Sequence, residues 1–138
     1  MLWDLRPIGL TGSKAEKVCD YVGIIINKNA VSGDASAQVP GGIRLGTAAL
    51  TSRNLKEEHI KKVAEFMHRA IQIALQVQKE AGSKLLKDFE RTALTGDGEG
   101  AKAIKELRKE VRAFATQFPL PGVDTSNLTK PEGIEEYD

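Results

Sequence analysis

The sequence has little of what metal, membrane and nucleic-acid sites are usually built from. One cysteine, Cys19, excludes an internal disulfide, and with only two histidines the chain lacks the ligands of a standard structural zinc site. Lys and Arg total 20 against 19 Asp and Glu, so the basic excess of a nucleic-acid-binding domain is missing. The longest apolar runs, such as residues 22–26, are too short to span a bilayer. We therefore expect no metal, membrane or nucleic-acid partner.

The composition is that of an ordinary globular domain. The chain has 138 residues, of which 41% are hydrophobic and 28% are charged. That length allows one domain with a core that needs no disulfide or metal. Asp4 and Arg6 interrupt the opening apolar residues, so no signal peptide is expected at the start of this sequence.

Apolar spacing and breaker residues predict a mixed order of strands and helices. Ser13 and Glu16 form a capping-box pattern, which predicts a helix that starts there and ends near Gly23. The isoleucines at 24–26 predict a strand that is buried on both faces. The other expected elements are strands at 3–5 and 43–47, a helix at 60–81 before Gly82, a short helix near 85–89 and a last helix at 104–118 that Pro119 stops.

This order predicts the fold class α/β, more closely an α+β layer. We expect a short three-stranded sheet with helices packed on one of its faces. Between residues 27 and 42 lies a long connection rich in Asn, Ser, Gly, Asp and Pro, and a loop of this length inside a small domain usually has a function.

Few side chains point to chemistry by their pattern alone. Arg44 lies in an apolar strand, where its guanidinium group can hold a carboxylate or can simply face solvent. Asn27 and Asn29 can line a pocket or cap a turn, and turn chemistry also accounts for the glycines at 33, 41 and 42. His59 and His68 are too far apart for a metal pair on one helix face, so we interpret both as surface residues and Cys19 as a core residue.

The order of these motifs resembles the C-terminal part of serine hydroxymethyltransferases. The resemblance covers about residues 1–123, and its motifs occur in the order found in that family. They are Trp3-Asp4-Leu5-Arg6-Pro7, Asn27-Lys28-Asn29, Gly33-Asp34, residues 40–47, Ala49-Leu50-Thr51-Ser52-Arg53 and Phe118-Pro119-Leu120-Pro121-Gly122.

The resemblance implies the small domain of a fold-type-I pyridoxal 5'-phosphate enzyme that interconverts serine and glycine and passes the one-carbon unit to tetrahydrofolate. By the match, Arg44 is the arginine that grips the amino-acid carboxylate. Asn29 is similar to the residue that hydrogen-bonds the folate pterin ring. Ala37 and Gln38 lie in the loop that lines the folate pocket in the family and are further candidates for folate binding.

The lysine that carries the cofactor in this family follows a histidine in a Thr-rich motif, and neither histidine here is followed by lysine. We therefore expect that residues 1–123 are the small domain, that this chain holds no catalytic residue and no tightly bound cofactor, and that it is inactive alone. We expect residues 124–138 to be a polar, mobile tail.

The resemblance further implies a homo-oligomeric full-length enzyme whose large domain is the partner of this chain. It is compatible with a cytoplasmic or a mitochondrial location. The alternative is a free-standing, non-catalytic binding or regulatory domain that reuses the fold.

Overall fold

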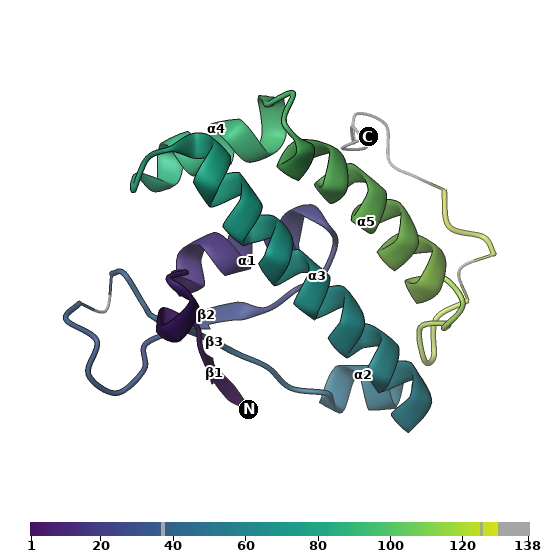
Figure 1. Cartoon of the computed structure of the whole chain (residues 1–138). Helices are drawn as coiled ribbons and strands as arrows, with labels where there is room; N and C mark the ends of the chain where they lie inside the picture. Colours follow the sequence, from purple (N-terminus) through teal and green to yellow (C-terminus); the bar gives the residue numbers. More distant parts are fainter. Residues whose placement is uncertain (37, 125, 130–138) are drawn as a thin grey trace.

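The computed structural model describes residues 1–36, 38–124 and 126–129 (Figure 1). Three short strands come first in the chain, interrupted by one helix, and four further helices follow them. The elements are β1 (Leu2–Asp4), a 3₁₀ turn (Arg6–Ile8), α1 (Gly12–Tyr21), β2 (Asn27–Asn29), β3 (Gly42–Arg44), α2 (Ala48–Ser52), α3 (Glu57–Ala81), α4 (Leu86–Thr95) and α5 (Glu99–Ala115).

The sheet is antiparallel, with β3 in the centre between β1 and β2. Arg44 pairs with Leu2 on one side and with Asn27 on the other, and Gly42 pairs in the same way with Asp4 and Asn29. Because side chains alternate along a strand, these two rows share one face of the sheet. The middle residue of β3 points to the other face.

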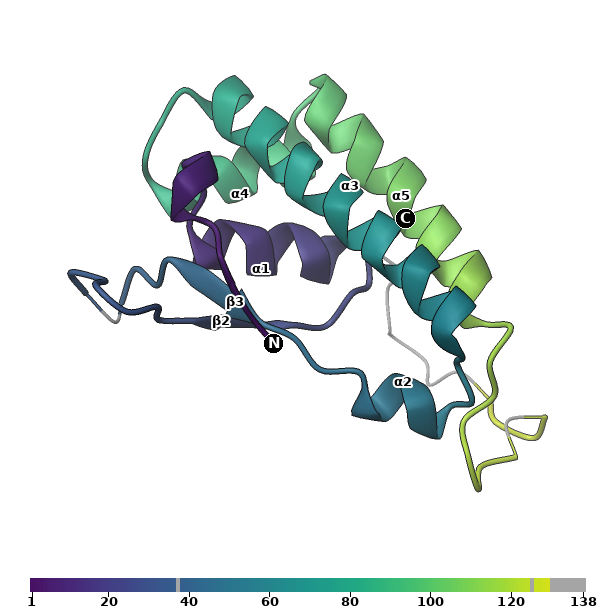
Figure 2. The ribbon, with the colours of Figure 1, turned by 60° about the horizontal axis from the view of Figure 1, so that its bottom comes forward.

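The main hydrophobic core lies on that other face. Ile43 is fully buried there, and Figure 2 shows α1 between the sheet and the layer formed by α3, α4 and α5. The largest fully buried side chain is Phe89 of α4. The predicted arrangement, a three-stranded sheet with helices packed on one face, is confirmed.

The first helix, α1, starts close to the predicted position, but its N-cap residue is not the one expected. The N-cap of α1 is Thr11, whose hydroxyl accepts from the Lys14 N–H, so the expected Ser13 cap is wrong. Ser13 is instead buried in the first turn. The end of α3 agrees with the prediction. Gly82, directly after its last residue, adopts the left-handed conformation expected of it, with φ of 58°.

The strand predicted at residues 24–26 is wrong. The strand comes three residues later, as β2, and Ile25 is 82% exposed. Continuing the register would place Ile25 opposite Gly46, but β3 ends at Arg44 and the chain turns into α2 at Ala48. Without a partner strand there, residues 24–26 form a connection. Ile24 and Ile26 still pack against the core.

Other elements also differ from the predictions, and the strand expected at 43–47 is shorter and spans Gly42–Arg44. No sequence pattern predicted α2, which ends at Ser52. The next residue, Arg53, donates to the backbone carbonyls of Ala115, the last residue of α5, and of Phe118 beyond it. The last helix ends at Ala115 instead of continuing to Phe118, and Phe118 packs edge-on against His59 with 4.9 Å between ring centroids. The boundary proposed after residue 123 falls in a segment that includes residues 125 and 130–138, which lie outside the described residues.

Candidate functional site

The face of the sheet that points away from the helices carries the strongest candidate residue. Arg44 is exposed there, between Leu2 and Asn27 in the register. Within the described residues its guanidinium group makes no hydrogen bond or ion pair. An arginine held by a central strand, with its donors unused, can bind a carboxylate through two parallel hydrogen bonds.

Asn29 lies on the same face, one row further along, opposite Gly42. Its side-chain amide donates to the Ala30 carbonyl at 2.6 Å, which orients the group and leaves its own oxygen as an acceptor. The structure therefore places Asn29 at the end of a strand, with its amide group held by the carbonyl of the next residue.

Gly41 and Gly42 form a tightly packed corner at the start of β3. A Cβ on Gly42 would lie 2.6 Å from the Trp3 carbonyl oxygen and 2.7 Å from a Val31 methyl group, and a Cβ on Gly12 would overlap the Gly42 carbonyl oxygen. Hydrogen bonds from Leu5 and Gly12 to the carbonyls of Gly41 and Pro40 close the corner. The glycines are required by close approach here, which is more than the turn chemistry that the sequence indicated.

A carboxylate fixes the loop that enters this corner. Asp34 accepts hydrogen bonds from the N–H groups of Gly41 at 2.8 Å and Val31 at 2.9 Å. It also accepts one from the Arg6 guanidinium group at 3.3 Å. Arg6 in turn forms a two-pronged pair with Asp4 and donates to the Ser32 carbonyl. The Gly41 and Val31 hydrogen bonds, followed by Arg6, hold the pKa of Asp34 below its usual 3.8.

Sequence reasoning missed Asp34 and Arg6 as functional candidates. A signal was present for part of this network, because an Asp that accepts from a backbone N–H three residues away is a common local turn pattern. The contact with Arg6 spans 28 positions of the sequence, and no local pattern indicates it.

The two remaining predicted folate contacts are not joined to this group. Gln38 is exposed, and its N–H donates to the Ser36 hydroxyl at 3.1 Å. Within the described part of the chain, no hydrogen bond connects Gln38 to Asn29 or Arg44. Ala37 lies outside the described residues.

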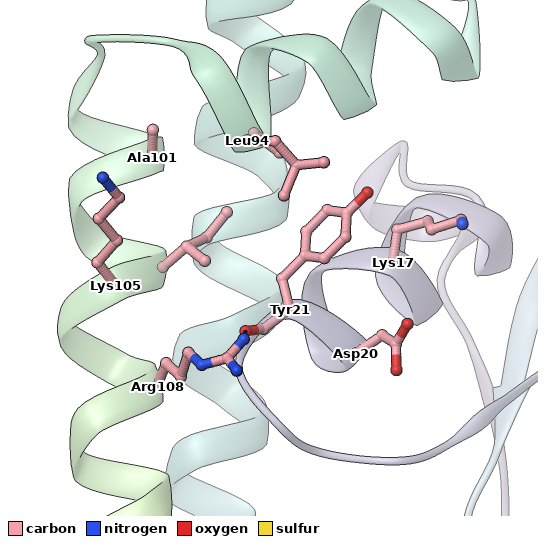
Figure 3. Close-up of a pocket in the computed structure, with 9 residues that line it drawn as sticks. Lys17, Asp20, Tyr21, Leu94, Ala101, Lys105 and Arg108 are labelled. Carbon is pink, nitrogen blue, oxygen red and sulfur yellow. Dashed lines mark hydrogen bonds between the residues drawn. The ribbon is translucent and has the colours of Figure 1, made fainter. Parts of the chain in front are cut away.

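A groove of about 560 Å³ lies on the helical side of the molecule, between α1, α4 and α5. Figure 3 shows the Tyr21 ring standing between Leu94 and Arg108. The cations near it contribute to packing: Arg108 donates to the Tyr21 carbonyl at 3.1 Å, and Lys17 pairs with Glu90 at 2.9 Å. None of the residues predicted as site residues lines this groove, so the open sheet face is the better candidate.

The described residues do not fit pyridoxal phosphate. That cofactor needs a lysine facing a cavity, and Lys14, the buried lysine, directs its ammonium group to Gln78 at 2.9 Å and to the Phe89 ring. Lys17 and Lys105 line the groove between α1, α4 and α5, but Lys17 is paired with Glu90 at 2.9 Å, and none of the predicted site residues lines that groove.

The described residues also contain no cluster of His, Cys, Asp and Glu suited to a metal ion. Cys19 is fully buried in the core, as expected, and burial raises its pKa to about 12. None of the helices within the described ranges is both long and apolar enough to cross a membrane.

Comparison with known proteins gives the family. The family "Serine hydroxymethyltransferase" matches residues 1–67. Serine hydroxymethyltransferase 5 of Arabidopsis thaliana is 47% identical over 122 residues, which are 88% of this chain and 25% of that protein. The cytosolic serine hydroxymethyltransferase of Oryctolagus cuniculus is 48% identical over 124 residues, or 89% and 25% of the two chains.

These matches place the chain in a family of transferases. It belongs to the serine hydroxymethyltransferase family and spans about a quarter of the length of the curated relatives it matches. A further relative, 40% identical over 89% of this chain and 23% of its own length, is serine hydroxymethyltransferase 3, chloroplastic, of Arabidopsis thaliana. One named relative is cytosolic and another chloroplastic, so the family is not confined to one compartment.

Proposed function

We propose that this chain is the C-terminal small domain of a serine hydroxymethyltransferase and that it works as part of a longer enzyme. That enzyme interconverts serine and glycine and transfers the one-carbon unit to tetrahydrofolate. The observation that carries the proposal is Arg44, exposed on the open sheet face of a chain that belongs to this family. In the proposal, residues 1–123 form the domain and the rest of the enzyme covers this face in a homo-oligomer.

Arg44 has the role of binding the carboxylate of serine or glycine. The two flanking strands fix the backbone of Arg44, so its planar fork approaches the ligand from a defined direction. A charge-assisted hydrogen bond of this kind contributes about 1.5–3 kcal/mol. Lysine at this position would retain the charge and lose the second parallel hydrogen bond.

Asn29, with Gln38 and Ala37 further along the loop, has the role of binding tetrahydrofolate. The support for Asn29 is its orientation by the Ala30 carbonyl and its place on the face that carries Arg44. Gln38 is supported by its exposure in the loop between β2 and β3. Ala37 is carried by the resemblance alone.

Pyridoxal phosphate is the cofactor that the family implies for the whole enzyme, where it supplies the electron sink for chemistry at the amino-acid carbon. Because the described residues do not fit it, we assign it to the part of the enzyme outside this chain. We expect the 138-residue chain to be inactive by itself with serine, pyridoxal phosphate and tetrahydrofolate, and activity under those conditions would contradict this assignment.

Two substitutions in the full-length enzyme test the roles of the two site residues against each other. Arg44→Lys is expected to raise the KM for serine about tenfold or more, because the bidentate contact is lost, and to leave the KM for tetrahydrofolate near its original value. Asn29→Ala is expected to do the reverse. Steady-state kinetics with each substrate varied in turn measure both constants.

Each variant is the control for the other, since both lie on the same sheet face. Absorbance of the bound cofactor should be unchanged in both variants. An unchanged serine KM in Arg44→Lys would remove Arg44 from the site. Equal increases in both constants for Asn29→Ala would show a general loss of structure in place of a folate contact.

A further inference from the structure

The loop between β2 and β3 begins on the sheet face that carries Arg44. Gly42 and Arg44 point to this face because Ile43, between them, is buried in the core on the opposite side. The position of a Cβ on Gly42 lies 2.7 Å from a methyl group of Val31. Val31 therefore covers Gly42 from the open face, and it is buried there outside the main core cluster.

Asp34 holds Val31 in that place. One carboxylate oxygen accepts from the N–H groups of both Val31 and Gly41, so a single atom joins the start of the loop to its end. The Asp34 N–H also donates to the Val31 carbonyl at 3.0 Å, which closes the turn. The side chain of Asp34 is only 7% exposed, although the loop is otherwise mostly open to solvent.

Arg6 fixes the clamp to β1. Its guanidinium group reaches Asp34 at 3.3 Å, the Ser32 carbonyl at 3.0 Å and Asp4 at 2.7 Å, and its aliphatic stem packs where a side chain on Gly41 would lie. The loop is thus anchored to the opposite edge of the sheet, across the central strand.

We propose that Asp34 is a positioning residue for the tetrahydrofolate site. With Arg6 it holds the start of the β2–β3 loop against Gly41 and Gly42, and so fixes the place of Asn29, the last residue of β2, relative to Arg44. This inference rests on the proposed function. Asp34 touches no ligand itself and acts through the backbone that it ties together.

The test uses the full-length enzyme with Asp34→Asn. This substitution keeps the size of the side chain but replaces one accepting oxygen with an NH₂ group, which faces the N–H donors of the loop or of Arg6. We expect the KM for tetrahydrofolate to rise about tenfold, because the loop contacts lose their alignment. The KM for serine should stay within about twofold, because Arg44 lies in the central strand, which is paired on both sides, whereas Asn29 is the last residue of the edge strand β2, directly before the loop. A purely structural role would lower the active fraction without separating the two constants.

The matched control is Asp124→Asn. Asp124 also accepts a backbone N–H inside its own turn, from Ser126 at 2.9 Å, and it lies outside the sheet. Neither KM should change in it. Arg6→Lys is the second variant for use if Asp34→Asn fails to fold, and it should raise the tetrahydrofolate KM in the same direction. Unchanged tetrahydrofolate KM, or equal increases for both substrates, would overturn the inference.

Amide hydrogen exchange in the 138-residue chain separates this inference from the proposed function. If the full-length protein shows no tetrahydrofolate-dependent conversion of serine, the proposed function fails. The clamp is still tested by the exchange rates of the Val31 and Gly41 amides, which should rise at least tenfold in Asp34→Asn. Unchanged exchange would show that Asp34 does not hold the loop.

Discussion

Two arginines of this chain, Arg6 and Arg44, differ in whether the fold uses their hydrogen-bond donors. Arg6 uses its donors on Asp4, Asp34 and the Ser32 carbonyl, so it serves to hold the loop. Arg44 has no hydrogen bond or ion pair within the described residues and faces solvent from a central strand. A charged group that the fold positions but does not use is the one available to a ligand.

Among single residues, Arg44 could be predicted as a site candidate from the sequence, and Asp34 could not. The alternation of a strand was enough to send Arg44 to one face and its neighbour Ile43 to the core. Asp34 depends on Gly41, seven positions away, and on Arg6, 28 positions away, and those distances become short only when the sheet forms.

The carboxyls of the loop clamp should make its order sensitive to acid. Hydrogen bonds from Gly41 and Val31 lower the pKa of Asp34 below 3.8, and the side-chain hydrogen bond with Arg6 lowers the pKa of Asp4 in the same direction. A carboxyl whose pKa is lowered on folding stabilises the fold above its unfolded value, and this contribution is lost as the pH falls through the lower, folded value. We therefore expect the clamp to be intact at pH 5 and to open below pH 3.8.

NMR titration of the Val31 and Gly41 amide shifts between pH 2 and pH 6 measures this opening. The Asp34→Asn variant is the control, since it should lack the transition. An apparent midpoint at or above 3.8 for both amides would contradict the expected direction of the shift.

Among the elements, helices agree with sequence expectation better than strands do. The long apolar stripe of α3 predicted a helix that the structure confirms up to Gly82. The strands are three residues each, too short for periodicity to set their bounds, and partner availability decides where they lie. For this reason the isoleucines at 24–26 failed as a strand, while the polar segment Asn27–Asn29 became one.

The contact between α1 and β3 depends on glycine at position 12. A Cβ there would overlap the Gly42 carbonyl oxygen, which belongs to the central strand and cannot move without disturbing both pairings. Gly12→Ala should therefore lower the free energy of unfolding by about 1–3 kcal/mol, as measured by urea denaturation.

Gly46→Ala is the matched control for that substitution. A Cβ at Gly46 meets nothing within 4 Å, and its φ is outside the left-handed region. Its effect should stay within about 0.5 kcal/mol. Similar losses in the two variants would show that close packing at Gly12 is not what the fold requires.

In the described part of the chain, helices cover one face of the sheet. Helices bury one side of β3, while the other side shows Arg44, Asn27 and a half-exposed Leu2. The chain also spans about a quarter of the length of its relatives. Both facts support the proposal that the open face belongs to a site completed by a larger protein.

The fold class followed from the order of apolar patterns, because layers are set by which faces must be buried. The site did not follow from pattern, since an exposed arginine on a sheet has no chemistry of its own. The role proposed for Arg44 comes from the family resemblance, and the structure gives the geometry by which it can be tested.

The size of the native protein in its source decides whether this chain is part of a longer enzyme. An immunoblot of a cell extract with an antibody raised against this 15.0 kDa chain measures it. We expect a band about four times larger, since the matched segment is about a quarter of each relative. A native band near 15 kDa would contradict it, and would favour a free-standing domain whose open face binds a different partner.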